Sequence, residues 1–249
     1  MIVRFLGNGG FISNGLPYNA FLIDGDFLVE CPPDIMGTLR GQGIDYSSIK
    51  RIYLSHFHGD HYFGMPFLTL NLLNRHMETA RDAPKIQVIG PRTVKEHVVA
   101  LQKTAVSEDN PSVAWIDAAY DFHEIDESSK VTLPGIGEMR FHRMAHSKET
   151  YGFSIFKNGE CLLVYLADTT WDDSFLRILS QRPAYVICDL NGGPSDKIKQ
   201  HMSESDIIEK AMPVTGGATK YIGTHLRNDC ASAHENLIYA RAGTTIEVR

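Results

Sequence analysis

Short runs of alternating or apolar residues, separated by turn residues, dominate the first third of the chain and predict strands. Residues 2–6 form the first of these strands. Residues 19–23 and 26–30 flank Asp24-Gly25, a dipeptide that strongly favours a two-residue hairpin turn. Further along, the pattern predicts strands over 51–55 and 86–90, and helices over 62–73 and 93–104.

The middle third is predicted to be mostly β. Residues 113–125 and 130–144 alternate weakly between polar and apolar side chains. Asn158-Gly159 joins residues 150–157 to 160–167, which predicts a second tight hairpin.

Helices and strands alternate in the last third. The pattern there predicts a helix over 172–180, a strand over 185–190, a helix that begins after Ser203 with Asp206 in a capping arrangement, a strand over 221–224 and a hairpin over 237–248 around Ala242-Gly243. Both halves of the chain carry strands and helices, and no repeat or Pro/Ser-rich linker divides them. We therefore predict one α/β domain over residues 1–249, built of layered sheets and helices.

Composition excludes several classes of protein. The 249 residues are 43% hydrophobic and 22% charged, which is typical of a globular chain and excludes collagen-like and disordered classes. The longest apolar run, residues 161–167, is far shorter than the roughly 20 residues of a membrane span. The four cysteines are widely spaced and form no Cys-x-x-Cys pair, so we expect reduced thiols in a cytoplasmic protein with no membrane association.

Charge argues against one class of partner. The formal net charge is −6, whereas a protein that holds a long nucleic acid normally carries a basic excess. We therefore expect no long nucleic-acid partner.

The strongest chemical signal is a cluster of metal-ligating side chains directly after the predicted strand 51–55. His56, His58, Asp60 and His61 place three imidazoles and a carboxylate within six residues. Both groups are good ligands for zinc and similar metals. In a loop, the first two histidines can converge on one ion while the other two residues turn towards a second. A solvated polar loop is the alternative, and the density of the cluster favours metal binding.

This His-x-His-x-Asp-His run resembles the signature of the metallo-β-lactamase-fold superfamily. The resemblance implies an αβ/βα sandwich, with two mixed β-sheets flanked by helices and a dinuclear metal site at one edge. Three later residues, each in order along the chain, match the family's remaining ligands: His146, Asp168 and His225. The resemblance implies one ion on His56, His58 and His146, a second on Asp60, His61 and His225, and Asp168 as the bridge between them.

Three local features resemble the ribonuclease Z and small phosphodiesterase branch of that superfamily. Residues 60–66 resemble its Asp-His-x-x-Gly-Leu-Pro run, and residues 5–9 its Phe-Leu-Gly-Thr-Gly opening. His201-Met202-Ser203 resembles its His-x-Ser/Thr element, which implies that His201 faces the phosphate as a proton donor. The alternative for His201 is a residue near a helix N-terminus with no chemical role.

The chain also departs from that branch. Ribonuclease Z carries a tRNA-binding arm, inserted in its short forms between the third metal histidine and the bridging aspartate. His146 and Asp168 are only 22 positions apart, and the hairpin around Asn158-Gly159 takes up almost all of them. The family's Asp-Cys-Gly is replaced by residues 30–33, Glu-Cys-Pro-Pro, which changes the support behind the metal loop.

These features predict a hydrolase that depends on two divalent metal ions, zinc first, with manganese and iron as alternatives. The expected substrate is a small or short phosphodiester, such as a cyclic nucleotide or an RNA end, attacked by a hydroxide that bridges the ions. Asp60 is expected to orient that hydroxide, and His201 to protonate the leaving oxygen. For Arg227 we weigh a phosphate contact against an exposed, ion-paired arginine and favour the latter.

Other interpretations stay open. A thioesterase or lactonase of the same fold uses the same metals but leaves His201 without an obvious task. A non-catalytic metal-binding protein is a third possibility, and a homodimer is neither indicated nor excluded. The remaining histidines have no motif around them and are interpreted as structural: His76, His97, His123, His142 and His234.

Overall fold

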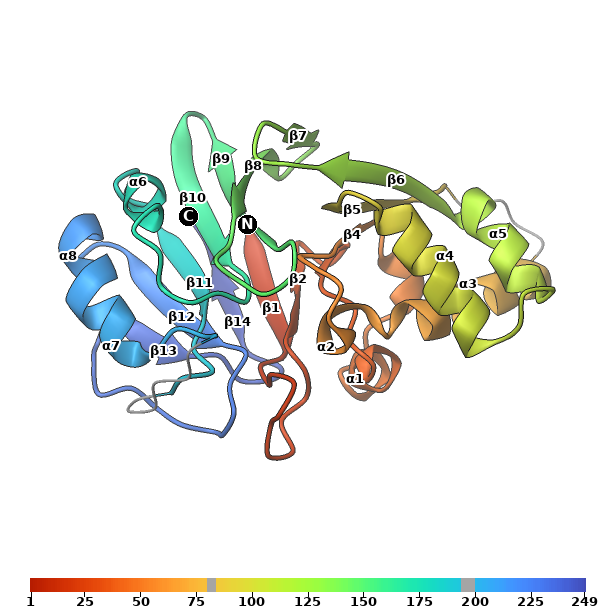
Figure 1. Cartoon of the computed structure of the whole chain (residues 1–249), viewed down its shortest axis with the longest axis horizontal. Coiled ribbons are helices and arrows are strands. Elements are labelled where there is room, and N and C mark those ends of the chain that lie inside the picture. The colour runs from red at the N-terminus through yellow and green to blue at the C-terminus, as the bar shows by residue number, and fades with distance from the viewer. Residues whose placement is uncertain (80–83, 194–199) are drawn as a thin grey trace.

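Two seven-stranded β-sheets pack against each other, with helices on their outer sides (Figure 1). The computed structural model describes residues 1–79, 84–193 and 200–249. The strand order is β14-β1-β2-β3-β4-β5-β6 in the first sheet and β13-β12-β11-β10-β9-β8-β7 in the second. Both sheets mix parallel and antiparallel pairs, as predicted for an αβ/βα sandwich.

The strands of the first sheet are β1 (Ile2–Gly7), β2 (Ala20–Ile23), β3 (Phe27–Val29), β4 (Arg51–Tyr53), β5 (Ile86–Pro91), β6 (Tyr120–Ile125) and β14 (Thr245–Glu247). Those of the second are β7 (Lys130–Leu133), β8 (Gly137–Arg143), β9 (Tyr151–Lys157), β10 (Glu160–Leu166), β11 (Tyr185–Asp189), β12 (Lys220–Thr224) and β13 (Leu237–Tyr239).

Helices of the first half of the chain cover the outer face of the first sheet, and helices of the second half cover the second sheet (Figure 1). The first group is α1 (Ile35–Gly41), η1 (Tyr46–Ser48), α2 (Gly59–Tyr62), α3 (Met65–Thr79), α4 (Val94–Ala105) and α5 (Pro111–Ala119). The second is α6 (Phe175–Leu179), α7 (Glu204–Asp206), the π-helical turn η2 (Ile207–Ala211) and α8 (Met212–Thr215). In the part of the chain that the structure describes, no helix combines the length and apolar character needed to cross a membrane.

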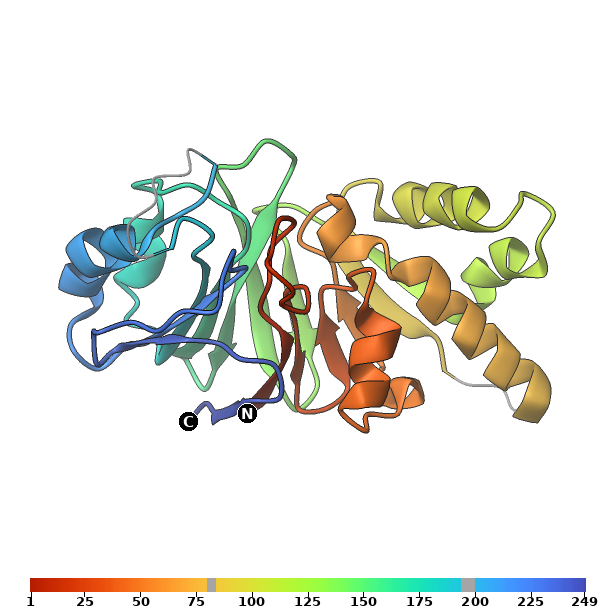
Figure 2. The ribbon, with the colours of Figure 1, turned by 90° about the horizontal axis from the view of Figure 1, so that it is seen from below.

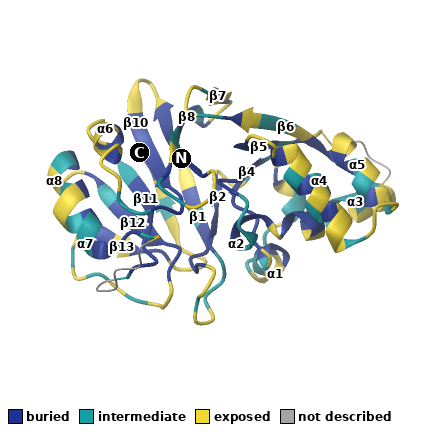
Figure 3. Ribbon diagram, in the orientation of Figure 1, coloured by how far each residue is buried: buried dark blue, intermediate teal, exposed yellow. Residues whose placement is uncertain are grey.

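Aromatic side chains contribute to the core between the two sheets. Figure 3 shows that the central strands consist largely of buried residues. Tyr53 meets Phe153 edge to face at a ring-centroid distance of 5.0 Å, and Phe21 meets Tyr165 in the same way at 5.2 Å. Such pairs stabilise a core by about 0.5–1.5 kcal/mol each beyond the burial of their area. The contacts fix the two sheets against each other beneath the edge that carries the histidine cluster.

Both predicted hairpins form, and the Asn158-Gly159 turn has the predicted two residues. The connection at Asp24-Gly25 is one residue longer than predicted, because Ile23 pairs with Phe27 and Asp26 also belongs to the loop. Asp24 and Gly25 have φ of 47° and 78°, and Asn158 and Gly159 have φ of 55° and 86°. A two-residue type I′ turn requires positive φ at both central residues, which Asn, Asp and Gly tolerate best. The dipeptides therefore set the register of β2 with β3 and of β9 with β10.

The prediction of β structure over 113–125 is wrong in its first half. Residues 111–119 form helix α5, and only β6 follows as a strand. The Asn110 side chain accepts a hydrogen bond from the Ser112 N–H, and Pro111 occupies the first helical turn. This N-terminal cap and proline favour a helix, and they outweigh the weak alternation of the segment.

The prediction of a final hairpin over 237–248 is also wrong. The turn around Ala242-Gly243 exists, but its two flanking strands join different sheets. β13 pairs in parallel with β12, whereas β14 pairs antiparallel with β1. A turn dipeptide determines the local direction of the chain, but it does not determine with which strand each flanking segment will pair.

Candidate metal centre

The carboxyl ends of neighbouring strands meet at one edge of the sandwich. β10, β11 and β12 are parallel neighbours, and their ends place Asp168, Asp189 and His225 close together. Across the sandwich, β4 leads into the His56–His61 cluster. His225 adopts a left-handed backbone with φ of 58°, a conformation that residues other than glycine seldom take outside turns and functional sites.

Helix α2 orients the second half of the cluster. His58 precedes its first turn, and Asp60 and His61 lie within it, both buried. The carbonyl of His61 accepts a hydrogen bond of 2.7 Å from the Cys31 N–H. Gly64 lies so close to the preceding loop that a Cβ there would be 2.1 Å from the Pro32 carbonyl oxygen. Glycine is therefore required for α2 and its ligand-bearing turn to pack at this depth.

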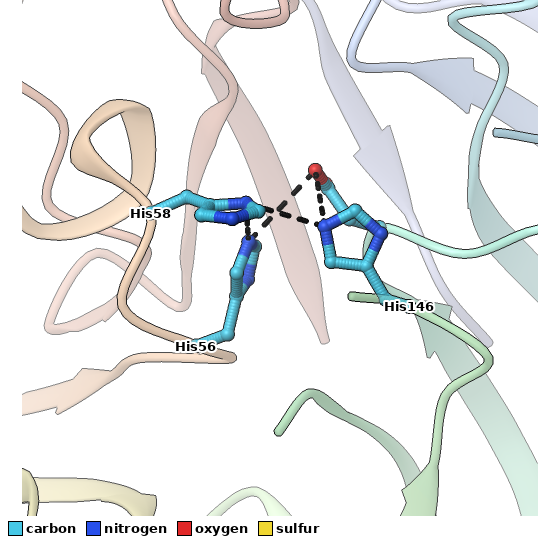
Figure 4. A group of neighbouring side chains, drawn as sticks. His56, His58 and His146 are labelled. Carbon is cyan, nitrogen blue, oxygen red and sulfur yellow. Dashed lines mark hydrogen bonds and ion pairs between the residues drawn. The ribbon is translucent and has the colours of Figure 1, made fainter. Parts of the chain in front are cut away.

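Three imidazoles and one carboxylate form a first group (Figure 4). His58 Nδ1 lies 3.0 Å from His56 Nε2 and 3.2 Å from His146 Nε2. Asp168 Oδ2 lies 3.9 Å from each of those two Nε2 atoms. Ligand atoms on one tetrahedral zinc ion are about 3.4 Å apart, so this group has the dimensions of a single metal site.

A second group shares Asp168 with the first. Asp60 Oδ2 lies 3.1 Å from His225 Nε2 and 3.5 Å from His61 Nε2. Asp168 Oδ2 lies 3.3 Å from His225 Nε2, and its Oδ1 lies 3.3 Å from His61 Nε2. The Asp168 carboxylate therefore lies between the two groups.

Several buried polar atoms of these groups make no hydrogen bond within the described residues. They are both ring nitrogens of His61, Nδ1 of His146 and of His225, and Oδ1 of Asp168. A buried polar atom without a partner is costly, and the great majority find one. Two of these atoms, His61 Nε2 and Asp168 Oδ1, belong to the second ligand group, and an unpartnered imidazole nitrogen beside an unpartnered carboxylate oxygen fits the donor set of a divalent metal ion.

The buried carboxylates require nearby positive charge. Burial by itself lowers the pKa of His61 and His225, but the charge of Asp168 and of the neighbouring carboxylates outweighs burial. As a result, the pKa of His61 is raised well above its usual range and that of His225 is raised to about 10. Conversely, burial raises the pKa of Asp168 and Asp60, and these histidines outweigh it, so both pKa values are lowered. Divalent ions supply the same compensation, and their binding would release the histidine protons.

The other three histidines favour the neutral form. Burial is the largest cause that lowers the pKa of His56, His58 and His146 below the ordinary histidine value. The neutral imidazole carries the free lone pair that a metal requires. Ser55 Oγ lies 2.9 Å from Nδ1 of His56, a contact that orients the ring with Nε2 towards the group.

Glu30 supports the cluster from behind. Its Oε1 lies 3.5 Å from His61 Nδ1 and accepts a 3.1 Å hydrogen bond from the Tyr165 hydroxyl. Its Oε2 accepts a 3.2 Å bond from the Ser55 N–H. The residue is fully buried with φ of 64°. The replacement of the family's Asp-Cys-Gly by Glu-Cys-Pro-Pro therefore places a longer side chain against the loop that carries the histidines, with its carboxylate hydrogen-bonded.

Asp189 was not among the residues that the sequence singled out. Its Oδ2 lies 2.6 Å from His201 Nδ1, and its Oδ1 lies 3.4 Å from His225 Nδ1. Burial lowers the pKa of His201, but the Asp189 carboxylate outweighs it and raises that pKa above the ordinary value. The sequence offered one signal for Asp189: this residue lies near the end of the predicted strand 185–190, just as Asp168 and His225 lie at the ends of neighbouring strands.

A cavity of about 560 Å³ opens above the two groups. It is lined by Phe11, Ile12, His58, Asp60, His146, Asp168, Asn191, Gln200, His201, His225 and Arg227. His201 therefore shares one cavity with candidate ligands of both groups. Arg227 also reaches it and is exposed, as we favoured from the sequence, but no ion pair holds its guanidinium within the described residues, contrary to the same interpretation. None of the five histidines interpreted as structural belongs to a metal-sized group in the ranges that the structure describes.

Comparison with known proteins assigns the family. Residues 1–209 match the family described as anti-Pycsar protein Apyc1. The chain belongs to this family. The match covers most of the chain, from β1 through the α7 region, and includes every candidate ligand except His225.

Solved structures similar to this family member confirm the metallo-β-lactamase fold. The metallo-β-lactamase fold protein YhfI from Bacillus subtilis superposes with a TM-score of 0.74 at 18% identity, and the alignment covers 98% of both chains. The short form of human tRNase Z superposes with a TM-score of 0.75 at 18% identity, over the whole of both chains.

Curated sequences place the chain near ribonucleases of this fold. Ribonuclease BN of Citrobacter koseri is 25% identical over 191 residues, which are 76% of this chain and 56% of that protein. The chain spans between about a quarter and just over half of the length of the curated relatives it matches first.

Proposed function

We propose that this chain is a metal-dependent phosphodiesterase that acts on a small or short phosphodiester, such as a cyclic nucleotide or an RNA end. One observation carries the proposal: His201, held by Asp189, lines the same cavity as two metal-sized groups that share Asp168. The similarity to ribonucleases, which cleave phosphodiesters, supports the same reaction class.

The residues fit two divalent ions, with zinc expected first and manganese or iron as alternatives. His56, His58 and His146 would hold one ion, and Asp60, His61 and His225 the other, with Asp168 shared. Bound there, such ions act as Lewis acids towards a phosphoryl oxygen and lower the pKa of water from 15.7 towards about 7.

Two side chains of the protein would orient the attacking water and protonate the leaving group. Asp60, which is buried beside His225 and lines the cavity, would accept a hydrogen bond from the attacking water and orient it. Because His201 uses Nδ1 to bind Asp189, its Nε2 is left to donate a proton to the leaving oxygen. A correctly placed general acid contributes about 10²–10⁴-fold in rate. The raised pKa of His201 keeps that proton available at neutral pH.

A small substrate is favoured over a folded RNA. Of the 21 residues between His146 and Asp168, β9, β10 and their two-residue turn take up residues 151–166, which leaves no segment for a tRNA-binding arm. With a net charge of −6, the chain lacks the basic excess that holds a polyanion at physiological salt. The local positive charge of two ions would still attract a single phosphate.

We therefore expect the metal-loaded protein to hydrolyse bis(p-nitrophenyl) phosphate and cyclic nucleotides but not precursor tRNA. The measurement is a competition at physiological salt among these three substrates, with zinc and with manganese. Site-specific cleavage of the tRNA 3′ end would contradict the proposed substrate size.

The same assay separates the alternatives. A parallel panel of thioesters and lactones detects the other hydrolases of this fold. Turnover confined to that panel would assign the chain to a thioesterase or lactonase, and no turnover of any substrate by fully loaded protein would favour a non-catalytic metal-binding protein.

A further inference from the structure

Glu204 is a buried carboxylate that belongs to neither ligand group and does not line the cavity above them. Its Oε2 accepts a 2.9 Å hydrogen bond from the Tyr239 hydroxyl, and its Oε1 accepts a 2.5 Å bond from the Ser232 hydroxyl. Burying a carboxylate is costly unless its oxygens are hydrogen-bonded. The two hydroxyls therefore explain how the carboxylate is accommodated at this place.

The two bonds join segments that lie far apart in the sequence. Glu204 begins helix α7 and comes three residues after His201. Ser232 lies in the irregular connection between β12 and β13, and Tyr239 ends β13. In Figure 1 and, from below, in Figure 2, the blue helix α7 lies next to the C-terminal strands. The carboxylate thus ties the segment that carries His201 to the segment that leaves β12.

The backbone around His201 is attached to the residues that follow β11. The Gly192 N–H donates to the Met202 carbonyl at 3.0 Å. The Glu204 N–H donates to the Gly193 carbonyl, also at 3.0 Å. These bonds hold the segment on the β11 side, and the Glu204 side chain supplies its attachment on the β13 side.

Helix α7 has a cap that does not involve Glu204. The Ser203 N–H donates to Asp206 Oδ2 at 2.9 Å as part of a reciprocal capping box. A capping box satisfies N–H groups at the start of a helix that would otherwise lack a partner. The Glu204 carboxylate is therefore not needed to begin the helix, and its bonds act on where the helix lies.

We propose that Glu204 is a positioning residue, which fixes the place of His201 over the two ligand groups through its bonds to the two hydroxyls. The ring centroid of His201 lies 5.1 Å from that of His225 and 5.8 Å from that of His146. A proton donor must lie within hydrogen-bond reach of the leaving oxygen, and a misplacement of about 1 Å can cost about 10²-fold in rate. The inference rests on the proposed function, in which His201 donates that proton.

The test compares two leaving groups. Glu204→Ala is expected to lower kcat by about 10-fold or more for a 3′,5′-cyclic nucleotide, whose leaving group is an alkoxide that must be protonated. The loss should be much smaller for bis(p-nitrophenyl) phosphate, and metal content should stay near the wild-type value. Glu204→Gln should restore most of the rate, because an amide can accept from one hydroxyl and donate to the other. Glu209→Ala, which removes an exposed carboxylate from η2, is the matched control.

Combination with His201→Ala separates positioning from a general effect on the fold. If Glu204 acts through His201, Glu204→Ala should cause no further loss in a protein that already lacks the imidazole, since the effects of coupled residues are not additive. A further loss of full size in the double variant would overturn the proposal. Equal losses on both substrates in the single variant would overturn it as well and leave Glu204 a structural residue.

Amide hydrogen exchange tests the attachment independently of the reaction. In Glu204→Ala, peptides that cover residues 200–206 and 230–239 should exchange about 10-fold faster or more, while the remaining peptides exchange at the wild-type rate. Tyr239→Phe removes one of the two bonds and keeps the ring, so it should affect the same two segments and keeps the test decisive if the alanine variant does not fold.

Unchanged exchange over residues 200–206 in both variants would overturn the proposal, whatever the activity. If the wild-type protein turns over no phosphodiester while exchange rises in these two segments alone, the proposed function fails and the role of Glu204 in fixing His201 stands.

Discussion

Replacing Asp168 by alanine is expected to remove both metal ions and to lower kcat/KM by about 10⁴-fold or more. The carboxylate lies within 3.3–3.9 Å of ring nitrogens in both ligand groups, so its loss weakens each of them. Lewis-acid catalysis contributes several kcal/mol, and each 1.36 kcal/mol corresponds to a factor of ten in rate. The measurements are metal content by elemental analysis and turnover of bis(p-nitrophenyl) phosphate.

The matched control is Asp117→Ala, which removes an exposed carboxylate paired with Lys95 on the far helices. It should retain full metal content and activity. Circular dichroism of both variants checks that the sandwich is still folded. An Asp168→Ala protein that keeps both ions, or keeps wild-type turnover, would contradict the shared role of this carboxylate.

Replacing His201 by alanine should separate chemistry from metal binding. We expect metal content to stay near the wild-type value while kcat falls by about 10²-fold or more on a substrate with a poor leaving group. The reason is that His201 binds Asp189 through Nδ1 and lines the cavity, whereas both ligand groups are complete without it. With a p-nitrophenolate leaving group, which needs little protonation, the loss should be much smaller.

His123→Ala is the control, because this ring is only half-buried and contacts only Asp121 among the described ion pairs and hydrogen bonds. The outcome also decides between two roles. Asp189, His201 and His225 form a further group with ligand atoms within 4.8 Å of one another. Loss of metal in His201→Ala would make this residue a ligand, and unchanged turnover of the poor substrate would leave it structural.

Local signals predicted most of the fold. Asp24-Gly25 and Asn158-Gly159 specify their hairpins locally, because Asp, Asn and Gly tolerate the positive φ values that these turns need. Helix α5 was missed because the prediction followed the weak alternation of residues 113–125 and took no account of the cap at Asn110. The separation of β13 and β14 into different sheets depends on pairing with strands far away in the chain, which no turn residue encodes.

The candidate site likewise contains residues that could be predicted from the sequence and residues that could not. The density of the cluster marked His56, His58, Asp60 and His61, whereas His146, Asp168 and His225 were found only through the resemblance to the metallo-β-lactamase-fold signature. The structure brings all seven together. Glu30 and Asp189 act through other side chains, and their place beside His61 and His201 follows only from how the strands pack.

We expect this edge of the sandwich to hold two metal ions. The most direct measurement is the metal content of protein purified without chelator, combined with anomalous scattering from its crystals at the absorption edge of the bound metal. We predict two ions per chain, one among His56, His58 and His146 and one among Asp60, His61 and His225, with Asp168 touching both. At most one ion under metal excess, or ions at any other place, would contradict the account.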